Sequence, residues 1–279
     1  MKILKKYSLN KLISRIDQKV GLGKLEYLLS TNWFNPFLTL YFNLRSFPFR
    51  QAIYFPIFVY GHPRIYGLSG KMKIEGNKVK TGMIRFNMVM PGAPCNNSVN
   101  SEIFNEGTII FHGKGEIGTG TKIRVAFNAE LNIGHNFKIT DMCNIGCLKK
   151  ITIGDESWIV HRCQIFDSNY HYIENMNNHS IPFMAKEVVI GERCWICNSS
   201  SIMPGAIIPN NTIIASNSLV TKDYRSIPEY SIIGGVPAKL ISTGYTWLKS
   251  GCLQNKVAKF YKLYPNEMFL KNESTFEQF

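Results

Sequence analysis

The 279-residue sequence has no uninterrupted apolar run near the roughly 18 residues that a helix needs to cross a bilayer. We therefore expect no membrane-spanning helix. A secretion signal is also missing, because Asn10, Arg15 and Asp17 interrupt the Lys-rich start before any continuous apolar segment develops. From these two absences we expect a cytoplasmic location, with any membrane association being peripheral and at the inner face.

Acidic residues are scarce as well. The sequence has 19 Asp and Glu against 32 Lys and Arg, which gives a formal net charge of +13. Such a balance suggests an anionic partner. No nucleic-acid-binding motif accompanies the basic residues, so we expect no nucleic acid. A phosphate-bearing cofactor and an anionic membrane surface are better candidates.

An aliphatic residue recurs every six positions through much of the second half of the chain. A period of six matches neither the helical repeat of roughly 3.6 nor the strand repeat of 2, so it counts short strands together with their turns. We interpret the chain as short strands wound into a prism. One unbroken run comprises Ile190, Ile196, Ile202, Ile208, Ile214 and Val220. Earlier runs with the same step are Ile117 and Ile123, then Ile133, Ile139 and Ile145, then Ile153, Ile159 and Ile165.

A second register supports this interpretation. Four residues after an aliphatic residue of the repeat, a strand should point to the same side again, and of nine such companion residues all but one are small. Branched and small residues that alternate inward are what a narrow stacked interior needs. These companion residues are Phe137, Cys143, Ser157, Cys163, Cys194, Ser200, Ala206, Thr212 and Ser218.

Three of the seven cysteines fall on this same register. Cys143, Cys163 and Cys194 occupy inward positions, where cysteine is a small apolar filler in a reducing compartment. The Cys194-x-x-Cys197 pair would then have one residue inside and one at a turn. We expect no metal there.

The end of the repeat carries a resemblance. The segment 215–222, Ala-Ser-Asn-Ser-Leu-Val-Thr-Lys, is followed at 235–239 by Gly-Val-Pro-Ala-Lys. Together with the Ile-Gly hexapeptides, these motifs resemble the hexapeptide-repeat acyltransferases, and most of all their polysaccharide and sugar O-acetyltransferase branch. The resemblance covers roughly residues 65–242. It implies an all-β fold, a left-handed parallel β-helix, whose hand the period alone does not set.

The flanking regions lack the hexad. Residues 1–64 are rich in aromatics and proline, and we expect a cap over the open end of the solenoid. The alternative for residues 33–60 is peripheral membrane contact, since Arg45 and Arg50 lie among the aromatics. Residues 65–242 form the expected β-helix domain. Residues 243–279 are predicted to be a C-terminal helix that packs on the prism, and a tail.

The hexad is interrupted between Ile165 and Ile190, which are 25 residues apart where three repeats would need 18. We expect an extruded loop over residues 166–187, and loops on rigid scaffolds often carry active groups. This loop contains Asp167 and His171, which resemble the family's Asp-x-x-x-His motif. In that motif the histidine is the catalytic base.

Acetyl transfer to a sugar hydroxyl needs such a base. An imidazole that titrates near neutrality can take the hydroxyl proton as the oxygen attacks a thioester, and can then protonate the departing thiolate. We expect Asp167 to orient the ring of His171. Transfer would be direct, with backbone N–H groups of a neighbouring coil stabilising the oxyanion. His179, in the same loop, is expected to be structural and is the second candidate for the base.

The donor implied by the resemblance is acetyl-CoA, and the acceptor is a sugar or glycan. Lys222 and Lys239 match basic positions that contact coenzyme A phosphates in the family. Ser216 and Thr221 match backbone contacts to the pantetheine arm.

Trp195 matches the Trp of the family's Trp-Ile-Gly element, and we include the nearby Asn198 in the cofactor site. Cys197 replaces the family glycine here. A side chain therefore occupies the position where pantetheine approaches this turn.

The family places coenzyme A between neighbouring subunits, so the resemblance implies a homotrimer with parallel prism axes. Two other classes remain open. The same solenoid hosts zinc-dependent hydratases, for which His135, His161 and His171 would have to converge on one metal. A non-catalytic scaffold would need neither the loop nor the lysine motifs.

Overall fold

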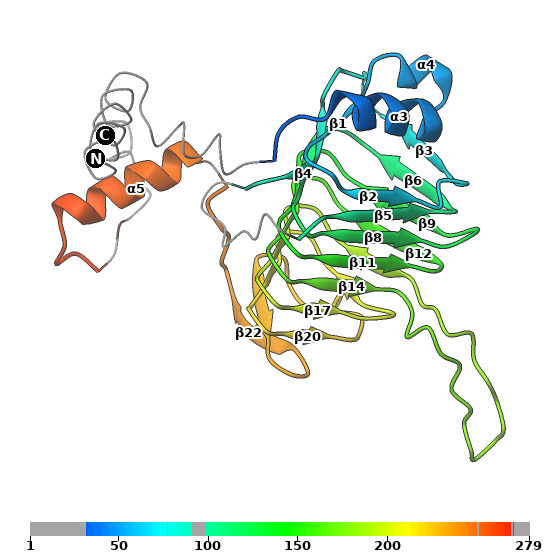
Figure 1. Ribbon diagram of the computed structural model, residues 1–279. Coiled ribbons are helices and arrows are strands. Elements are labelled where there is room, and N and C mark those ends of the chain that lie inside the picture. The colour runs from blue at the N-terminus through cyan, green and yellow to red at the C-terminus, as the bar shows by residue number, and fades with distance from the viewer. Residues whose placement is uncertain (1–31, 77, 91–98, 250, 269, 271–279) are drawn as a thin grey trace, which may run out of the picture.

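The computed structural model describes residues 32–76, 78–90, 99–249, 251–268 and 270. In these residues, short strands wind into a prism with three sheets as its faces, and two helices lie across one end (Figure 1). The fold is the all-β, left-handed parallel β-helix that the sequence implies. Residues 1–31 of the expected cap and residues 271–279 of the expected tail lie outside the described residues.

Each coil of the prism contributes one strand to each of three sheets, and these strands pair in parallel. Sheet one has the order β1 (Ile57–Val59), β4 (Ile84–Met88), β7 (Gly115–Gly118), β10 (Phe137–Ile139), β13 (Trp158–Ile159), β16 (Trp195–Ile196), β19 (Ile213–Ile214), β21 (Ser231–Gly234) and β22 (Lys239–Thr243). Its last pair, β21 with β22, is antiparallel.

The other two faces follow the same rule. Sheet two has the order β2 (Arg64–Tyr66), β5 (Glu102–Asn105), β8 (Lys122–Val125), β11 (Asn144–Cys147), β14 (Gln164–Phe166), β17 (Ser201–Ile202) and β20 (Leu219–Val220). Sheet three has the order β18 (Ile207–Ile208), β15 (Val188–Ile190), β12 (Lys150–Ile153), β9 (Glu130–Ile133), β6 (Thr108–Phe111) and β3 (Lys71–Ile74).

Both sequence registers point into the prism. Every aliphatic residue of the hexad and every companion residue is at most 2% exposed. Burial raises the pKa of the Cys163 and Cys194 thiols to about 12, so these cysteines are inert fillers, as predicted. The glycines after the aliphatic residues mark close approach, because a Cβ on Gly154 would lie 2.5 Å from the backbone carbon of Gly191 in the next coil.

The cap consists of α3 (Pro36–Ser46) and α4 (Phe49–Ala52) and closes the first coil. The Asn43 side chain donates to the carbonyl of Ile57 and accepts from its N–H, at 2.7 and 3.0 Å, and thus replaces a neighbouring strand at the edge of β1. Gln51 makes the same pair of bonds to Ile74 of β3. An open sheet edge is thereby satisfied by side-chain amides. These contacts are of the kind that a cap over the open end of the prism would make.

The prism begins earlier than the hexad suggests. Its first strand, β1, starts at Ile57 and pairs in parallel with β4, whereas the resemblance covers the chain only from about residue 65. The reason is that the early coils carry longer, irregular turns, which break the count of six without breaking the winding. The cap residues Asn43 and Gln51, which bond to the strand edges, also lie before residue 65.

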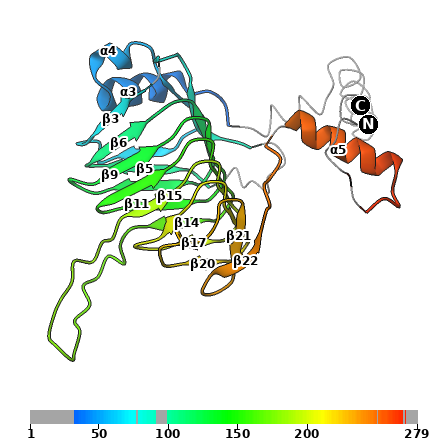
Figure 2. The ribbon, with the colours of Figure 1, turned by 180° about the vertical axis from the view of Figure 1, so that it is seen from behind.

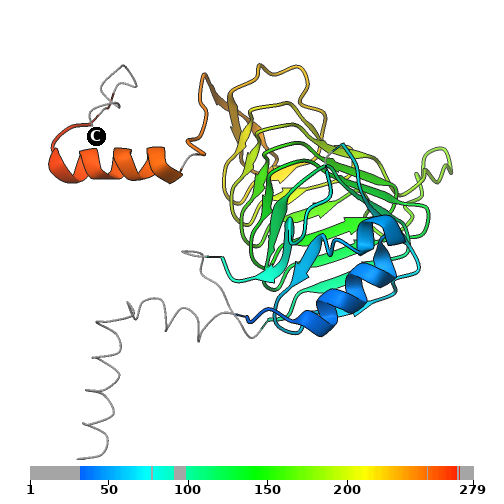
Figure 3. The ribbon, with the colours of Figure 1, turned by 90° about the horizontal axis from the view of Figure 1, so that it is seen from above.

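The C-terminal segment differs from the expectation in its packing. Helix α5 (Gly251–Leu263) is present but buries none of its residues, and it lies apart from the prism (Figures 1 and 3). Trp247, just before it, packs instead: its ring lies between those of Trp158 and Trp195, with centroids 4.6 and 5.6 Å away. The predicted packing of the helix itself is therefore wrong.

Among the described helices, none is long and apolar enough to cross a membrane.

Candidate active site

The loop that interrupts the repeat leaves the prism after β14 and returns at β15, and it projects far from the coils (Figures 1 and 2). Its two legs meet at a narrow neck, where Ser168 pairs with Ala185 and the Lys186 N–H donates to the Asp167 carbonyl at 2.8 Å. Beyond the neck nearly every residue is exposed. The strand bounds place residues 167–187 between β14 and β15, so Phe166, the first residue of the expected loop, belongs to β14.

His171 lies just beyond this neck and lines a hollow of about 400 Å³ between the loop and the lower coils. Asn169 and Lys186 contribute from the two legs of the loop, while Leu219 and Thr221 contribute from the last full coil. The structure therefore brings together two residues that the sequence assigned to different tasks, the base His171 and the pantetheine contact Thr221. The hollow is open, as a site for a large acceptor must be.

The orienting role predicted for Asp167 is wrong in this structure. Its side chain is fully buried and points back into the preceding coil. One carboxylate oxygen accepts the Leu148 N–H at 2.8 Å, and the other accepts the N–H groups of Lys149 and Lys150 at 2.7 Å each. Both oxygens are engaged, so Asp167 holds the neck of the loop and does not hold the ring of His171.

Tyr170 fixes the loop beside His171. Its ring packs on that of Phe166, with centroids 6.1 Å apart, and burial raises its pKa. The hydroxyl lies over Gly146 so closely that a Cβ there would collide with it. The glycine at this place therefore positions the residue next to His171, which the hexad count by itself does not reveal.

His179 lies near the tip of the loop. Its ring is within 2.9 Å of the Glu174 carboxylate, and the side chain is 73% exposed. This is the structural role that the sequence predicts for it.

The two lysines proposed for the donor phosphates share one neighbour, Tyr224. The Lys222 ammonium lies 5.4 Å from the centre of the Tyr224 ring, and the Tyr224 hydroxyl donates to the carbonyl of Ala238, next to Lys239. Sequence analysis missed Tyr224. Its position in the sequence could have identified it, because Tyr224 stands four residues after Val220 and so falls on the inward companion register.

The other three expected cofactor residues lie elsewhere. Ser216 donates to the Asn198 side chain at 2.6 Å at the corner between sheets one and two. Trp195 lies on sheet one, where Trp247 covers it. Within one chain, neither place borders the His171 hollow. Because Trp195 packs against Trp247 on sheet one and does not line the His171 hollow, it is not part of the single-chain site that we propose.

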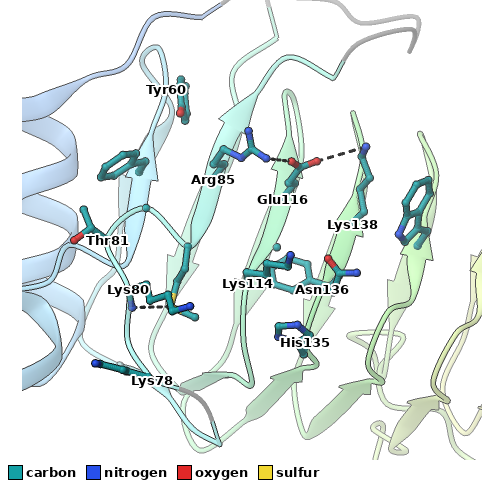
Figure 4. A pocket seen from close by; sticks show the side chains of 16 residues that line it. Tyr60, Lys78, Lys80, Thr81, Arg85, Lys114, Glu116, His135, Asn136 and Lys138 are labelled. Atoms are coloured by element: carbon teal, nitrogen blue, oxygen red, sulfur yellow. Dashed lines mark hydrogen bonds and ion pairs between the residues drawn. The ribbon is translucent and has the colours of Figure 1, made fainter. Parts of the chain in front are cut away.

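A second, larger hollow of about 670 Å³ lies on sheet one near the cap (Figure 4). Basic side chains surround it, and Glu116 is ion-paired with Arg85 and Lys138. The remaining basic side chains at its rim are those of Lys78, Lys80 and Lys114. Sequence analysis had given this region no role, because its coils lack the regular hexad.

The three histidines that a zinc site would need occupy three different corners of the prism. His135 lies between β9 and β10, His161 between β13 and β14, and His171 between β14 and β15. In the part of the chain that the structure describes, no group of three His, Cys, Asp or Glu residues is placed to hold a metal ion.

The comparison with known families bears on this geometry. A family model described as the bacterial transferase hexapeptide, six repeats, matches residues 187–222, the coils that form one wall of the His171 hollow. In these coils the chain is similar to the bacterial hexapeptide-repeat transferases.

Two proteins to which this chain is similar come from Escherichia coli K12. WbbJ, named as a lipopolysaccharide biosynthesis O-acetyl transferase, is 29% identical over 184 residues, which cover 63% of this chain and 89% of WbbJ. WcaF, named as a colanic acid biosynthesis acetyltransferase, is 26% identical over 120 residues, which cover 43% of this chain and 62% of WcaF.

A solved structure agrees in fold. The polysialic acid O-acetyltransferase OatWY is similar with a TM-score of 0.50 and 19% identity, covering 72% of this chain and 100% of that chain. At this identity the likeness shows the β-helix and nothing finer.

Proposed function

We propose that this protein transfers an acetyl group from acetyl-CoA to a hydroxyl of a sugar in the biosynthesis of a cell-surface glycan. The observation that carries the proposal is the hollow in which His171 of the extruded loop faces Thr221 of the last coils. The relatives named as O-acetyl transferases of lipopolysaccharide and colanic acid biosynthesis support the reaction class. A metal ion has no part in the proposed reaction.

In this proposal, His171 takes the proton of the acceptor hydroxyl as its oxygen attacks the thioester carbonyl. The carbon–sulfur bond then breaks, and the imidazolium gives its proton to the departing thiolate. The products are an O-acetyl sugar and coenzyme A with a free thiol, so no acyl-enzyme is needed. Backbone N–H groups would stabilise the oxyanion.

The direct test of the activity is thiol release. The purified protein is incubated with acetyl-CoA and a panel of cell-envelope sugars and nucleotide sugars, and the free thiol of coenzyme A is measured. We expect release that depends on one acceptor class. A protein that neither binds coenzyme A nor releases thiol would be a scaffold, whereas metal-dependent hydration without coenzyme A would indicate the hydratase class.

Changing Lys222 and Lys239 together to Ala should weaken coenzyme A binding by about 1 to 3 kcal/mol, because charge-assisted contacts to phosphate are lost. Calorimetric titration measures this loss of affinity. Higher salt should also weaken coenzyme A binding by the wild-type protein, because it screens the same charges. Lys73→Ala is the control, since Lys73 is paired with Glu75 on sheet three. Equal affinity of the double variant and the wild type would remove both lysines from the donor site.

We also propose a homotrimer with parallel axes, in which the loop of one subunit reaches its neighbour. The loop exposes large apolar side chains beyond its neck, among them Ile173, Met176 and Phe183, each more than half exposed. A single chain gives them no cover, and a neighbouring subunit would.

Light scattering should therefore give three times the 31.8 kDa of one chain at micromolar concentration. Replacing Ile173 and Met176 by Ser should shift this mass toward that of the monomer, because apolar contact area is lost. A monomeric wild-type protein would contradict the shared site.

A further inference from the structure

Helix α3 of the cap turns several polar side chains and one aromatic ring toward the protein, and it exposes an apolar side to solvent. Its buried residues are Thr39, Asn43 and Ser46, together with Phe42, whose ring packs near that of Phe86. Thr39 accepts the Val59 N–H at 3.0 Å, beside the bonds of Asn43 to Ile57. The strand edge below consists of backbone N–H and C=O groups, so the helix must offer polar side chains to it.

The opposite side of α3 forms an apolar stripe. Phe37, Leu40, Tyr41 and Leu44 follow the spacing of three and four residues that aligns side chains along one helix face, and all four are exposed, Phe37 by 84%. An amphipathic helix normally turns such a stripe inward. Here the stripe remains uncovered, and apolar surface of this kind marks an interaction site.

Further apolar side chains extend the stripe over the end of the prism. We call the whole surface the cap face. Figures 1 and 3 show α3 and α4 lying across this end, at the opposite end of the coils from β20. The exposed large apolar residues of the cap face are Trp33, Phe34, Phe37, Leu40, Tyr41, Leu44, Phe49, Ile53 and Tyr54.

The charged residues on the two cap helices are basic, and Glu75, which follows the Gln51 contact at Ile74, is paired with Lys73. The sequence has no acidic residue between Glu26 and Glu75, while Arg45 and Arg50 are exposed on the two cap helices. The basic hollow begins next to this end, because Phe58 and Tyr60 line it and the Phe58 ring contacts that of Phe34, with centroids 4.9 Å apart (Figure 4). Aromatic side chains with flanking arginines are typical of membrane interfaces.

We propose that the cap face binds the surface of an anionic lipid bilayer. The apolar stripe would enter the headgroup region while Arg45 and Arg50 contact lipid phosphates. A second copy of the cap would bring arginines against arginines, so its charge fits less well. Residues 1–31 fit less well for the same reason, since they carry 7 Lys and Arg against 2 Asp and Glu.

This orientation has a consequence for the assembly that we propose. In a trimer with parallel axes, three cap faces would lie at the same end and could contact one flat surface together. The prism would then stand on the membrane with its His171 loops held away from the lipid.

Co-sedimentation of the full-length protein with vesicles tests the proposal. The vesicles contain phosphatidylcholine with or without phosphatidylglycerol, and we expect binding to the anionic vesicles that weakens with salt. Phe37→Ser with Leu44→Ser should lower the partition coefficient about tenfold or more, because apolar area that enters the interface is lost. Arg45→Gln with Arg50→Gln should lower it about 30-fold, at roughly fivefold per basic residue.

Phe127→Ser is the matched control. Phe127 is 74% exposed in a turn after β8, outside the cap, and its loss should leave binding unchanged. Thermal unfolding of each variant checks that its fold is intact. If the variant with Phe37→Ser and Leu44→Ser is unstable, the variant with Arg45→Gln and Arg50→Gln provides the test. The proposal is overturned if the wild-type protein does not bind anionic vesicles, or if it binds neutral vesicles equally well. It is also overturned if Phe127→Ser weakens vesicle binding as much as the cap variants do. A change in the mass of the cap variants in solution, with vesicle binding unchanged, would overturn it as well.

Discussion

His171→Ala should lower the rate of acetyl transfer by about 10²- to 10⁴-fold while coenzyme A still binds. A general base acts on the proton that moves in the transition state, so its loss should appear in kcat and spare the affinity for the donor. The measurement is acceptor-dependent thiol release at saturating acetyl-CoA, together with a titration of coenzyme A. His171 is exposed and lies beyond the neck, so its substitution should leave the fold intact.

His179→Ala provides the matched control for this variant. His179 is in the same loop, is exposed and pairs with Glu174, so its loss should change turnover little. If His171→Ala kept near-wild-type turnover on a verified acceptor, the assignment of the base would be wrong. A large loss in His179→Ala under the same conditions would transfer the role to His179.

Asp167→Asn should lower the free energy of unfolding by on the order of 3 kcal/mol. The asparagine side chain has one oxygen, whereas three backbone N–H groups at residues 148–150 now bond to the carboxylate. Its NH₂ group would face N–H donors in a buried place, which leaves at least one of them unsatisfied. Chemical denaturation, with the linear slope compared between variant and wild type, measures the loss.

Asp155→Asn is the control for Asp167. Asp155 is exposed and its carboxylate accepts one backbone N–H, that of His135, so we expect a loss of about 1 kcal/mol or less. Activity of Asp167→Asn should fall only as far as the loop is displaced. A variant with wild-type stability and a strongly reduced kcat would contradict the anchoring role and restore the idea that Asp167 orients the catalytic ring.

The interior of the prism could be predicted from the sequence because its period is local. Within each run of the repeat, an inward position is fixed by a count of six or four along the chain, and the run from Ile190 to Val220 keeps that count without a break. The extruded loop followed from the same count, since seven surplus residues cannot fit in the coil. Tyr224 also obeys the companion register and could have been found in this way.

Contacts between coils could not be predicted in the same way. Asp167 was paired with His171 because the two are four residues apart, whereas its hydrogen bonds reach back to residues 148–150 in another coil. The contact between Trp195 and Trp247 could not be read from the sequence, because Trp247 is 52 positions away and lies outside the repeat. The outward apolar stripe of α3 was hidden for a related reason: the need for polar groups at a sheet edge outweighs the usual burial of apolar residues.

A structure of the protein with bound coenzyme A tests the central claim most directly. The account predicts that the coenzyme A sulfur lies in the hollow lined by His171 and Thr221, within reach of the His171 imidazole directly or through one water. The phosphates should lie near Lys222 and Lys239, with a neighbouring subunit completing the site. A sulfur bound far from every His171 of the assembly, for example in the basic hollow near the cap, would contradict the account.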